Sequence, residues 1–175
     1  MSTLALDKVH SAVNFTVKHM MVSKAKGEFQ EFDVAFSGDF NDLENASVTA
    51  KIDVSSIETN NEDRNGHLKS EDFFNTEQYP EITFESTSIK KLNDTDYEVT
   101  GDLTIRDVTN QATFKVEYNG TAKDPMEGNT IAGFDVEGSI NREAYGLTWN
   151  APLETGGVLI GKDVKVTAGF EFVVQ

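Results

Sequence analysis

Apolar residues occupy every second position over long stretches of this chain. In the clearest stretch, Tyr97, Val99, Leu103 and Ile105 alternate with acidic residues and threonines. The same alternation marks the ranges 13–17, 32–36, 46–54, 81–92, 112–118, 134–140 and 164–172. A period of two places successive side chains on opposite faces of a β-strand, whereas a helix repeats every 3.6 residues. The pattern therefore predicts about eight strands, each with one apolar and one polar face.

Turn-forming pairs separate these strands and suggest how the sheet is built. Asn93-Asp94, Asn119-Gly120, Asp124-Pro125 and Gly128-Asn129 all fall where the alternation lapses. A sheet with one apolar face and no amphipathic helices to cover it must close on itself or stack. We therefore expect an all-β fold, an elongated eight-stranded antiparallel barrel that forms one domain over residues 1–175. A barrel of this size is either filled by side chains or holds one small ligand.

One segment, Thr59 to Tyr79, breaks the alternation. Thr59 and Glu62 have the spacing of a capping box, and Ser70 before two acidic residues can begin a second helical turn. We expect one or two short helices, at about residues 60–75, across one end of the barrel. The large apolar residues Leu147 and Trp149 and the pair Phe73-Phe74 lie in poorly alternating stretches. They either plug the end of the barrel or border the mouth of a cavity.

Charge and composition exclude several classes of partner. Thirty acidic residues against fifteen basic ones give a net charge of −15, which opposes binding to nucleic acids and docking on anionic membranes. The chain has no cysteine, which excludes disulfides and thiolate metal sites. It shows neither a signal peptide nor a run of about 20 apolar residues. We expect a cytoplasmic protein without stable membrane insertion.

Candidate chemistry in the sequence is sparse. His10, His19 and His67 lack the short spacings of a metal site, so we expect no metal. The stretch from Gly156 to Lys162 has the spacing of a P-loop, but Asp163 replaces the hydroxyl that binds Mg²⁺ and a strand follows. It is interpreted as a loop entering that strand. No nucleophile elbow is present, and the carboxylates are too numerous to be informative, so no catalytic residue is predicted.

Short motifs in a fixed order resemble one known family. They are Asp7–Ser11, Phe15–His19, Gly27–Phe29, Ser56–Thr59, His67–Phe74, Tyr79–Phe84, Gly101–Arg106 and Asn141–Gly146. Together they are similar to the YceI-like, polyisoprenoid-binding family of lipocalin-like barrels. The resemblance implies an extended eight-stranded barrel with a long apolar pore for a polyprenyl or similar chain. Two departures are Asp107, where the family often has glycine, and the lack of the secretion signal that many relatives carry.

The resemblance makes a carrier or reservoir for a long-chain lipid the leading hypothesis, with no cofactor and with a homodimer as a candidate assembly. The expected apolar lining comprises Phe15, Val17, Phe84, Leu103, Ile105, Phe114, Val116, Phe134, Trp149 and Phe170. Residues near strand ends or in the helical segment are candidates for polar head-group contacts: His19, Arg64, His67 and Arg142. His19 continues the inward parity of its strand and is either a hydrogen-bonded rim histidine or a donor to the ligand. The alternatives are a lipid-modifying enzyme and a protein-binding or stress-related module with a filled barrel.

Overall fold

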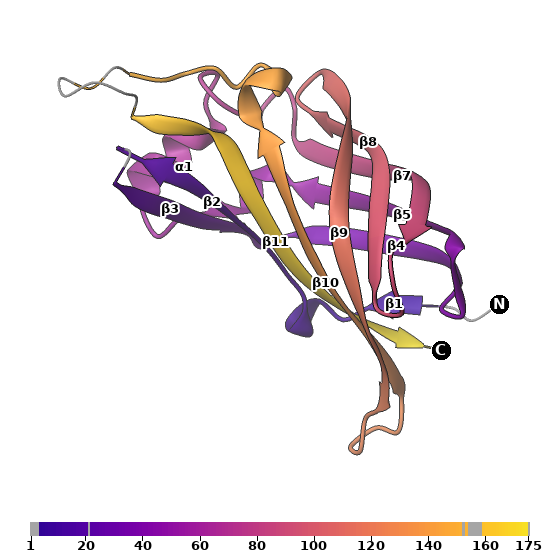
Figure 1. Ribbon diagram of the computed structural model, residues 1–175. Coiled ribbons are helices and arrows are strands. Elements are labelled where there is room, and N and C mark those ends of the chain that lie inside the picture. Colours follow the sequence, from indigo (N-terminus) through magenta and orange to yellow (C-terminus); the bar gives the residue numbers. More distant parts are fainter. Residues whose placement is uncertain (1–3, 21, 152, 154–158, 175) are drawn as a thin grey trace.

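A single antiparallel sheet curls round on itself in the computed structural model, which describes residues 4–20, 22–151, 153 and 159–174 (Figure 1). In chain order the elements are β1 (Leu4–Leu6), η1 (Lys8–His10), β2 (Ala12–His19), β3 (Ser23–Phe29), β4 (Phe32–Asp39), β5 (Asp42–Asp53), η2 (Val54–Ser56), β6 (Ile57–Glu58), α1 (Glu62–Lys69), β7 (Glu81–Lys91), β8 (Asp96–Ile105), β9 (Val108–Lys123), β10 (Thr130–Asn141), η3 (Arg142–Tyr145) and β11 (Ile160–Val174). Here η denotes a 3₁₀ helix. The expected all-β class is confirmed.

The described residues form eleven strands where about eight were expected, because three long strands are interrupted. β1 and β2 both pair with β11 and are separated by η1. β3 and β4 are separated by only two residues, and β5 and β6 by η2. The hydrogen-bonded path runs from β4 through β5, β7, β8, β9, β10, β11, β2 and β3 to β6. Since β4 continues β3 and β6 continues β5, the two ends of this path join and complete a ring of eight long strands.

Two aspartates that cap 3₁₀ helices and one serine stabilise these interruptions. Asp7 accepts a hydrogen bond from the backbone N–H of Val9 at the start of η1, at 3.0 Å. Asp53 caps η2 in the same way. The carbonyl and hydroxyl oxygens of Ser56 then accept the backbone N–H groups of the two residues between β3 and β4, at 3.2 and 2.9 Å. Interrupting a strand lets it change direction without leaving its backbone groups unsatisfied.

Two details of the expected strands are wrong. β3 was missed because its inward positions include Ala25 and Gly27, which give a weak alternation. Asn119-Gly120 is not a turn but lies within β9, where Gly120 has a φ of 86°. The pairing of β9 with β10 shifts register at this point, so the two residues form a β-bulge. Gly161 and Lys162 belong to β11, and Gly156 lies outside the described residues.

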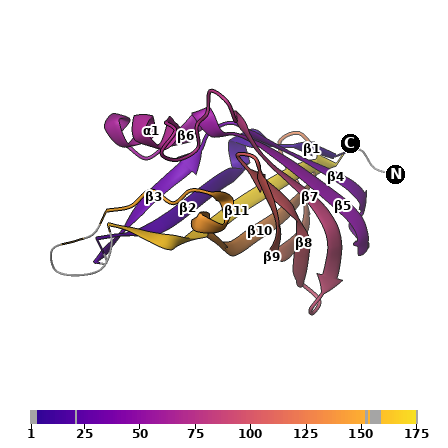
Figure 2. The same cartoon turned by 90° about the horizontal axis from the view of Figure 1, so that it is seen from above.

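The helical segment, expected to hold one or two short helices, contains one α-helix. α1 is capped by Asn61, whose side chain accepts the N–H of Arg64, so the capping box expected at Thr59 is wrong. Ser70 ends α1 instead of starting a second helix, and turns follow it. α1 lies beside β6, at one end of the curled sheet (Figure 2). In the described part of the chain, no helix is long and apolar enough to cross a membrane.

Candidate functional site

The curled sheet encloses an apolar cavity of about 620 Å³. This volume falls within the range of typical small-molecule sites, about 300–1,000 Å³. All ten residues expected to form an apolar lining do line it: Phe15, Val17, Phe84, Leu103, Ile105, Phe114, Val116, Phe134, Trp149 and Phe170. Nine of them lie on strands β2, β7, β8, β9, β10 and β11, and Trp149 lies in the segment after η3, so inward-pointing residues of one alternating pattern create most of a single shared interior.

Glycines in neighbouring strands keep three of these rings against the wall. A Cβ atom on Gly138 would lie 2.6 Å from Phe114, and one on Gly101 would lie 2.7 Å from Phe84. Phe15 lies over Gly27 in the same close manner. The missing side chains make room for the rings at the sheet surface. The phenylalanines therefore cover the backbone while the centre of the barrel stays open.

Five aromatic rings close one end of the cavity. We call this group the aromatic plug; it consists of Phe36, Phe40, Tyr118, Phe134 and Phe172. The ring of Phe134 lies at its centre, with its centroid 5.0 Å from that of Tyr118, 5.8 Å from Phe172 and 5.9 Å from Phe40. Phe36, Phe134 and Phe172 line the cavity, whereas Phe40 and Tyr118 pack behind them. Burial raises the pKa of the Tyr118 hydroxyl, as expected for a phenol inside an apolar group.

The opposite end of the cavity, near α1, carries the charged lining residues. The four predicted head-group residues all line the cavity: His19, Arg64, His67 and Arg142. Lys18, Lys26 and Asp63 border it as well, but Lys18 and Lys26 are exposed and alternate with the inward residues Val17 and Ala25. This end therefore brings two arginines, Arg64 and Arg142, and one carboxylate, Asp63, to the cavity lining.

Arg64 and His67 reach this end of the cavity from α1. The Arg64 guanidinium donates to the hydroxyl oxygen of Thr59 at 3.0 Å and to its carbonyl oxygen at 2.5 Å. A ring nitrogen of His67 lies 2.9 Å from the carboxylate of Asp72. The His67 ring also packs edge-on against Trp149, with centroids 4.6 Å apart. Both side chains are therefore held in place by protein partners while they line the cavity.

The aromatic residues Phe73, Phe74 and Trp149, together with Leu147, also line the cavity on this side. Phe73 and Leu147 are almost fully buried, and the rings of Phe73 and Trp149 lie 5.6 Å apart. These residues form an apolar part of the wall beside His67, whose ring contacts those of Phe73 and Trp149. The sequence left open whether they plug the barrel or border a mouth, and the structure places them along the cavity wall.

Arg142 is buried, with 4% of its surface exposed, and its guanidinium donates to four backbone carbonyls. Two belong to Leu147 and Trp149, and two to Ile160 and Gly161 at the start of β11. Burial lowers the pKa of this guanidinium, yet Arg remains charged at physiological pH. These bonds fasten the segment after η3 to the first residues of β11. Four of the five N–H groups of the Arg142 guanidinium donate to these carbonyls, and one does not.

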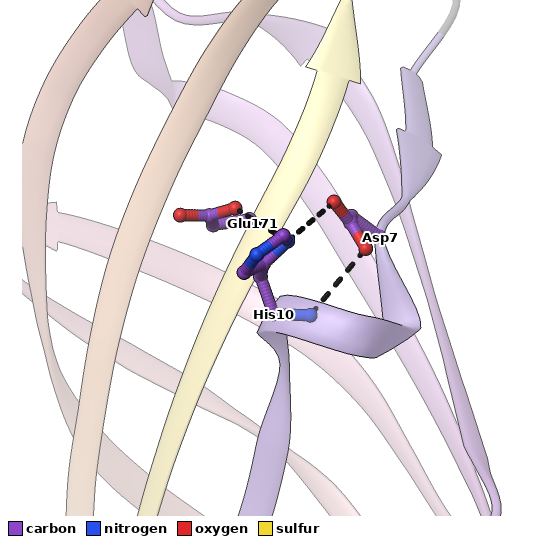
Figure 3. A group of neighbouring side chains, drawn as sticks. All are labelled: Asp7, His10 and Glu171. Carbon is purple, nitrogen blue, oxygen red and sulfur yellow. Dashed lines mark hydrogen bonds and ion pairs between the residues drawn. The ribbon is translucent and has the colours of Figure 1, made fainter. Parts of the chain in front are cut away.

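A further polar cluster lies on the outer side of β11, away from the cavity (Figure 3). His10 Nδ1 lies 2.9 Å from Asp7 Oδ2 and 3.6 Å from Glu171 Oε2. The hydrogen bond between His10 and Asp7 lowers the pKa of Asp7 and raises that of His10. The ligand-type atoms of the three residues lie within 4.8 Å of one another. Sequence reasoning missed this cluster because Glu171 is far away along the chain.

A protonated His10 between two carboxylates accounts for the approach of these three side chains without a cation. His10 is largely exposed, with 63% of its side chain accessible. The backbone N–H of Asp7 also donates to the carbonyl of Glu171 at 2.8 Å. The cluster therefore attaches the interruption between β1 and β2 to the neighbouring strand.

Comparison with known proteins agrees with this architecture. Residues 4–172 match the model of the YceI-like domain family. A UPF0312 protein of Staphylococcus aureus (strain N315) is 51% identical over 175 residues, which span all of this chain and 99% of the relative. A second UPF0312 protein, from the S. aureus strain USA300, is 49% identical over the same length.

Solved structures share the fold. The YceI protein of Campylobacter jejuni superposes with a TM-score of 0.69 at 29% identity, covering 94% of this chain and 96% of that one. Burkholderia cenocepacia BcnA gives a TM-score of 0.81 at 24% identity, over 95% and 99% of the two chains. A polyisoprenoid-binding domain from Saccharophagus degradans gives 0.69 at 16% identity, with full coverage of both. The family match over almost the whole chain and the relatives at about half identity lead to one conclusion: this chain belongs to the YceI-like family.

Proposed function

We propose that this protein binds a long-chain amphiphilic lipid of the isoprenoid type and carries or sequesters it inside the barrel. The observation that carries the proposal is the apolar cavity of about 620 Å³ inside a complete ring of strands. Apolar cavities of this size are costly to leave empty, because the side chains around them lose packing contacts. An apolar ligand restores those contacts and removes its own surface from water, which stabilises the complex by roughly 25 cal/mol per Å² buried.

The lipid tail lies along the phenylalanine-lined wall in this proposal, and the head group lies at the α1 end. Membership of the YceI-like family supports a lipid ligand, as does the likeness in fold to the polyisoprenoid-binding domain of S. degradans. A filled barrel that serves only as a protein-binding module fits the cavity less well, because its interior would be packed solid.

Head-group recognition is assigned to three lining residues with N–H donors. His19, Arg64 and His67 line the cavity, and their donors suit a phosphate or another anionic head. Arg142 acts indirectly, since four of its N–H groups already bond to backbone carbonyls of the wall. The two arginines of the lining, against the single carboxylate of Asp63, also favour an anionic head.

Native mass spectrometry before and after extraction with organic solvent tests the proposal. We expect purified protein to carry an extractable lipid, and delipidated protein to regain mass with a prenyl phosphate. A matched variant with His19→Ala and Arg64→Ala should retain the fold but bind the phosphate more weakly than the corresponding prenyl alcohol. Equal masses before and after extraction, with no uptake from prenyl phosphate, would sink the proposal in favour of a filled barrel.

Binding without chemical change is the second part of the proposal. Incubation with a polyprenyl diphosphate should leave the compound intact, as judged by chromatography and mass spectrometry of the extract. Turnover that follows the protein through purification and disappears in His19→Ala would instead establish a lipid-modifying enzyme. A heat-denatured sample provides the background rate.

A further inference from the structure

We infer that the aromatic plug limits how long a chain the cavity can accept. The inference rests on the proposed function and extends it to the tail of the ligand. A tail that enters from the charged α1 end meets Phe36, Phe134 and Phe172 at the far end of the cavity. Among the described residues, Phe40 and Tyr118 do not line the cavity and form a second layer behind these rings, next to the lining residue Leu43 at the start of β5. The cavity is therefore blind at this end.

The two layers of the plug are built from two separate parts of the sheet. Phe36 belongs to β4, whereas Tyr118, Phe134 and Phe172 belong to the neighbouring strands β9, β10 and β11. Phe40 lies in the turn between β4 and β5, and its ring stacks on Phe36 at 5.2 Å. Because several strands hold the rings, the plug cannot withdraw as one side chain would by changing a rotamer.

Local irregularities of the backbone bring both outer rings into place. The pairing of β4 with β5 shifts register at Gly38, where φ is 139°, just before Phe40. The bulge at Asn119-Gly120 follows Tyr118 directly. Bulges bend a strand and re-aim its side chains. Phe40 and Tyr118 consequently stack on each other across the end of the barrel, with centroids 5.8 Å apart.

A blind cavity gives affinity a characteristic dependence on tail length. Each methylene that enters the cavity strengthens binding by about fourfold, which corresponds to about 0.8 kcal/mol. Carbons beyond the plug cannot enter and stay in water at the mouth. Affinity should therefore rise with length, reach a break and then level off or fall. An open pore would show no such break.

The experiment measures dissociation constants for delipidated protein with prenyl monophosphates of increasing length, from farnesyl and geranylgeranyl phosphate upward. Wild-type protein should show the break. Phe40→Ala and Phe134→Ala each remove one ring of the plug and should move the break to longer chains. Phe114→Ala widens the middle of the cavity instead, so it should change affinities without moving the break.

The possible outcomes separate this inference from the function on which it rests. Affinity that keeps rising to the longest chain in wild-type protein overturns the length limit and leaves lipid binding standing. A break that stays in place in both plug variants assigns the limit elsewhere and also overturns it. Failure of every prenyl phosphate to bind sinks the proposed function itself. Phe40 lies in a partly exposed turn, so Phe40→Ala keeps the test decisive if Phe134→Ala fails to fold.

Discussion

The two ends of the barrel are held together by different forces. At the α1 end, Arg142 and Arg64 donate directional hydrogen bonds to backbone carbonyls and to a hydroxyl. At the other end, the rings of the aromatic plug pack against one another around Phe134. Water can replace a hydrogen-bonding partner at an opening, but it cannot replace packing contacts between rings. The α1 end is accordingly suited to admit a polar head group, and the plug end to exclude water.

The largest expected effect comes from replacing the central ring of the plug. Phe134→Ala should cost about 3–5 kcal/mol of unfolding free energy in delipidated protein, because it removes contacts in a close-packed group. Phe114→Ala should cost markedly less, because Phe114 already faces the open cavity. Urea denaturation of wild type and both variants measures these differences.

The stabilities of the same proteins can also be compared with lipid bound. A ligand at a hundredfold excess over its dissociation constant stabilises the folded protein by about 2.7 kcal/mol. Lipid should raise the melting temperature of wild type and raise that of Phe114→Ala less. Equal, lipid-independent losses in the two variants would mean that the cavity wall is packed as tightly as the plug, which contradicts the comparison.

The second effect concerns the α1 end. Arg142→Ala should cost about 2–4 kcal/mol, because it leaves four carbonyl oxygens without a charged donor, partly offset by water. Arg142→Lys should recover only part of this loss, because an ammonium group cannot reproduce the planar fork of a guanidinium. Chemical denaturation gives the stabilities. A loss below about 1 kcal/mol would show that the network is not what holds this end together.

The third effect lies in the wall between the two ends. Gly138→Ala places a methyl group 2.6 Å from Phe114, so the ring must move into the cavity. We expect a loss of about 1–3 kcal/mol together with weaker lipid binding, because the cavity becomes smaller. Gly133→Ala in the same strand is a matched control, since its methyl group would meet Asn119 at an ordinary 3.7 Å. Unchanged lipid affinity in Gly138→Ala would mean that Phe114 does not border the ligand.

The sequence predicted the wall of this barrel far better than its ends. Alternation of period two identifies inward residues such as Phe114 and Val116 because the strand itself fixes their direction. β3 escaped notice because glycine and alanine replace large residues where the ring of Phe15 needs space. The plug could not be predicted, since a register shift at Gly38 and a bulge at Gly120 lie beside its outer rings and neither has a simple sequence period.

The charged residues likewise divide into features that the local sequence reveals and contacts that only the folded chain creates. Arg142 was identified as a residue near a strand end, but its four carbonyl partners come from segments that only the folded chain brings together. The pair of Asp7 and His10 is visible as a local spacing, whereas Glu171 joins it only through the pairing of β1 with β11. Contacts between distant segments follow from strand register, and register depends on turns and bulges that composition does not reveal.

The smallest expected effect is a pH dependence of the cluster on the outer side of β11, close to the plug end. The pKa of His10 is raised from 6.5, first by its hydrogen bond to Asp7, and by the charges of Glu171 and Asp124. Its contribution to stability is therefore complete below pH 6.5 and is lost as the pH rises through the higher pKa of the folded state. The pKa of Asp7 is lowered from 3.8, so its contribution is present above that pH and is lost as the pH falls through the lower folded value.

The cluster should consequently stabilise the protein most between pH 3.8 and 6.5. His10→Ala should lower the melting temperature there by on the order of one degree, since exposed ion pairs contribute little. At pH values above the raised pKa of His10 the difference should shrink. Asp7→Asn serves as the control, because asparagine still caps η1 but carries no charge. In that background His10→Ala should leave only the weaker, pH-dependent contribution of Glu171, and thermal melts across the pH range would reveal it. A difference between wild type and His10→Ala that is the same at every pH would show that His10 acts through packing rather than through its charge.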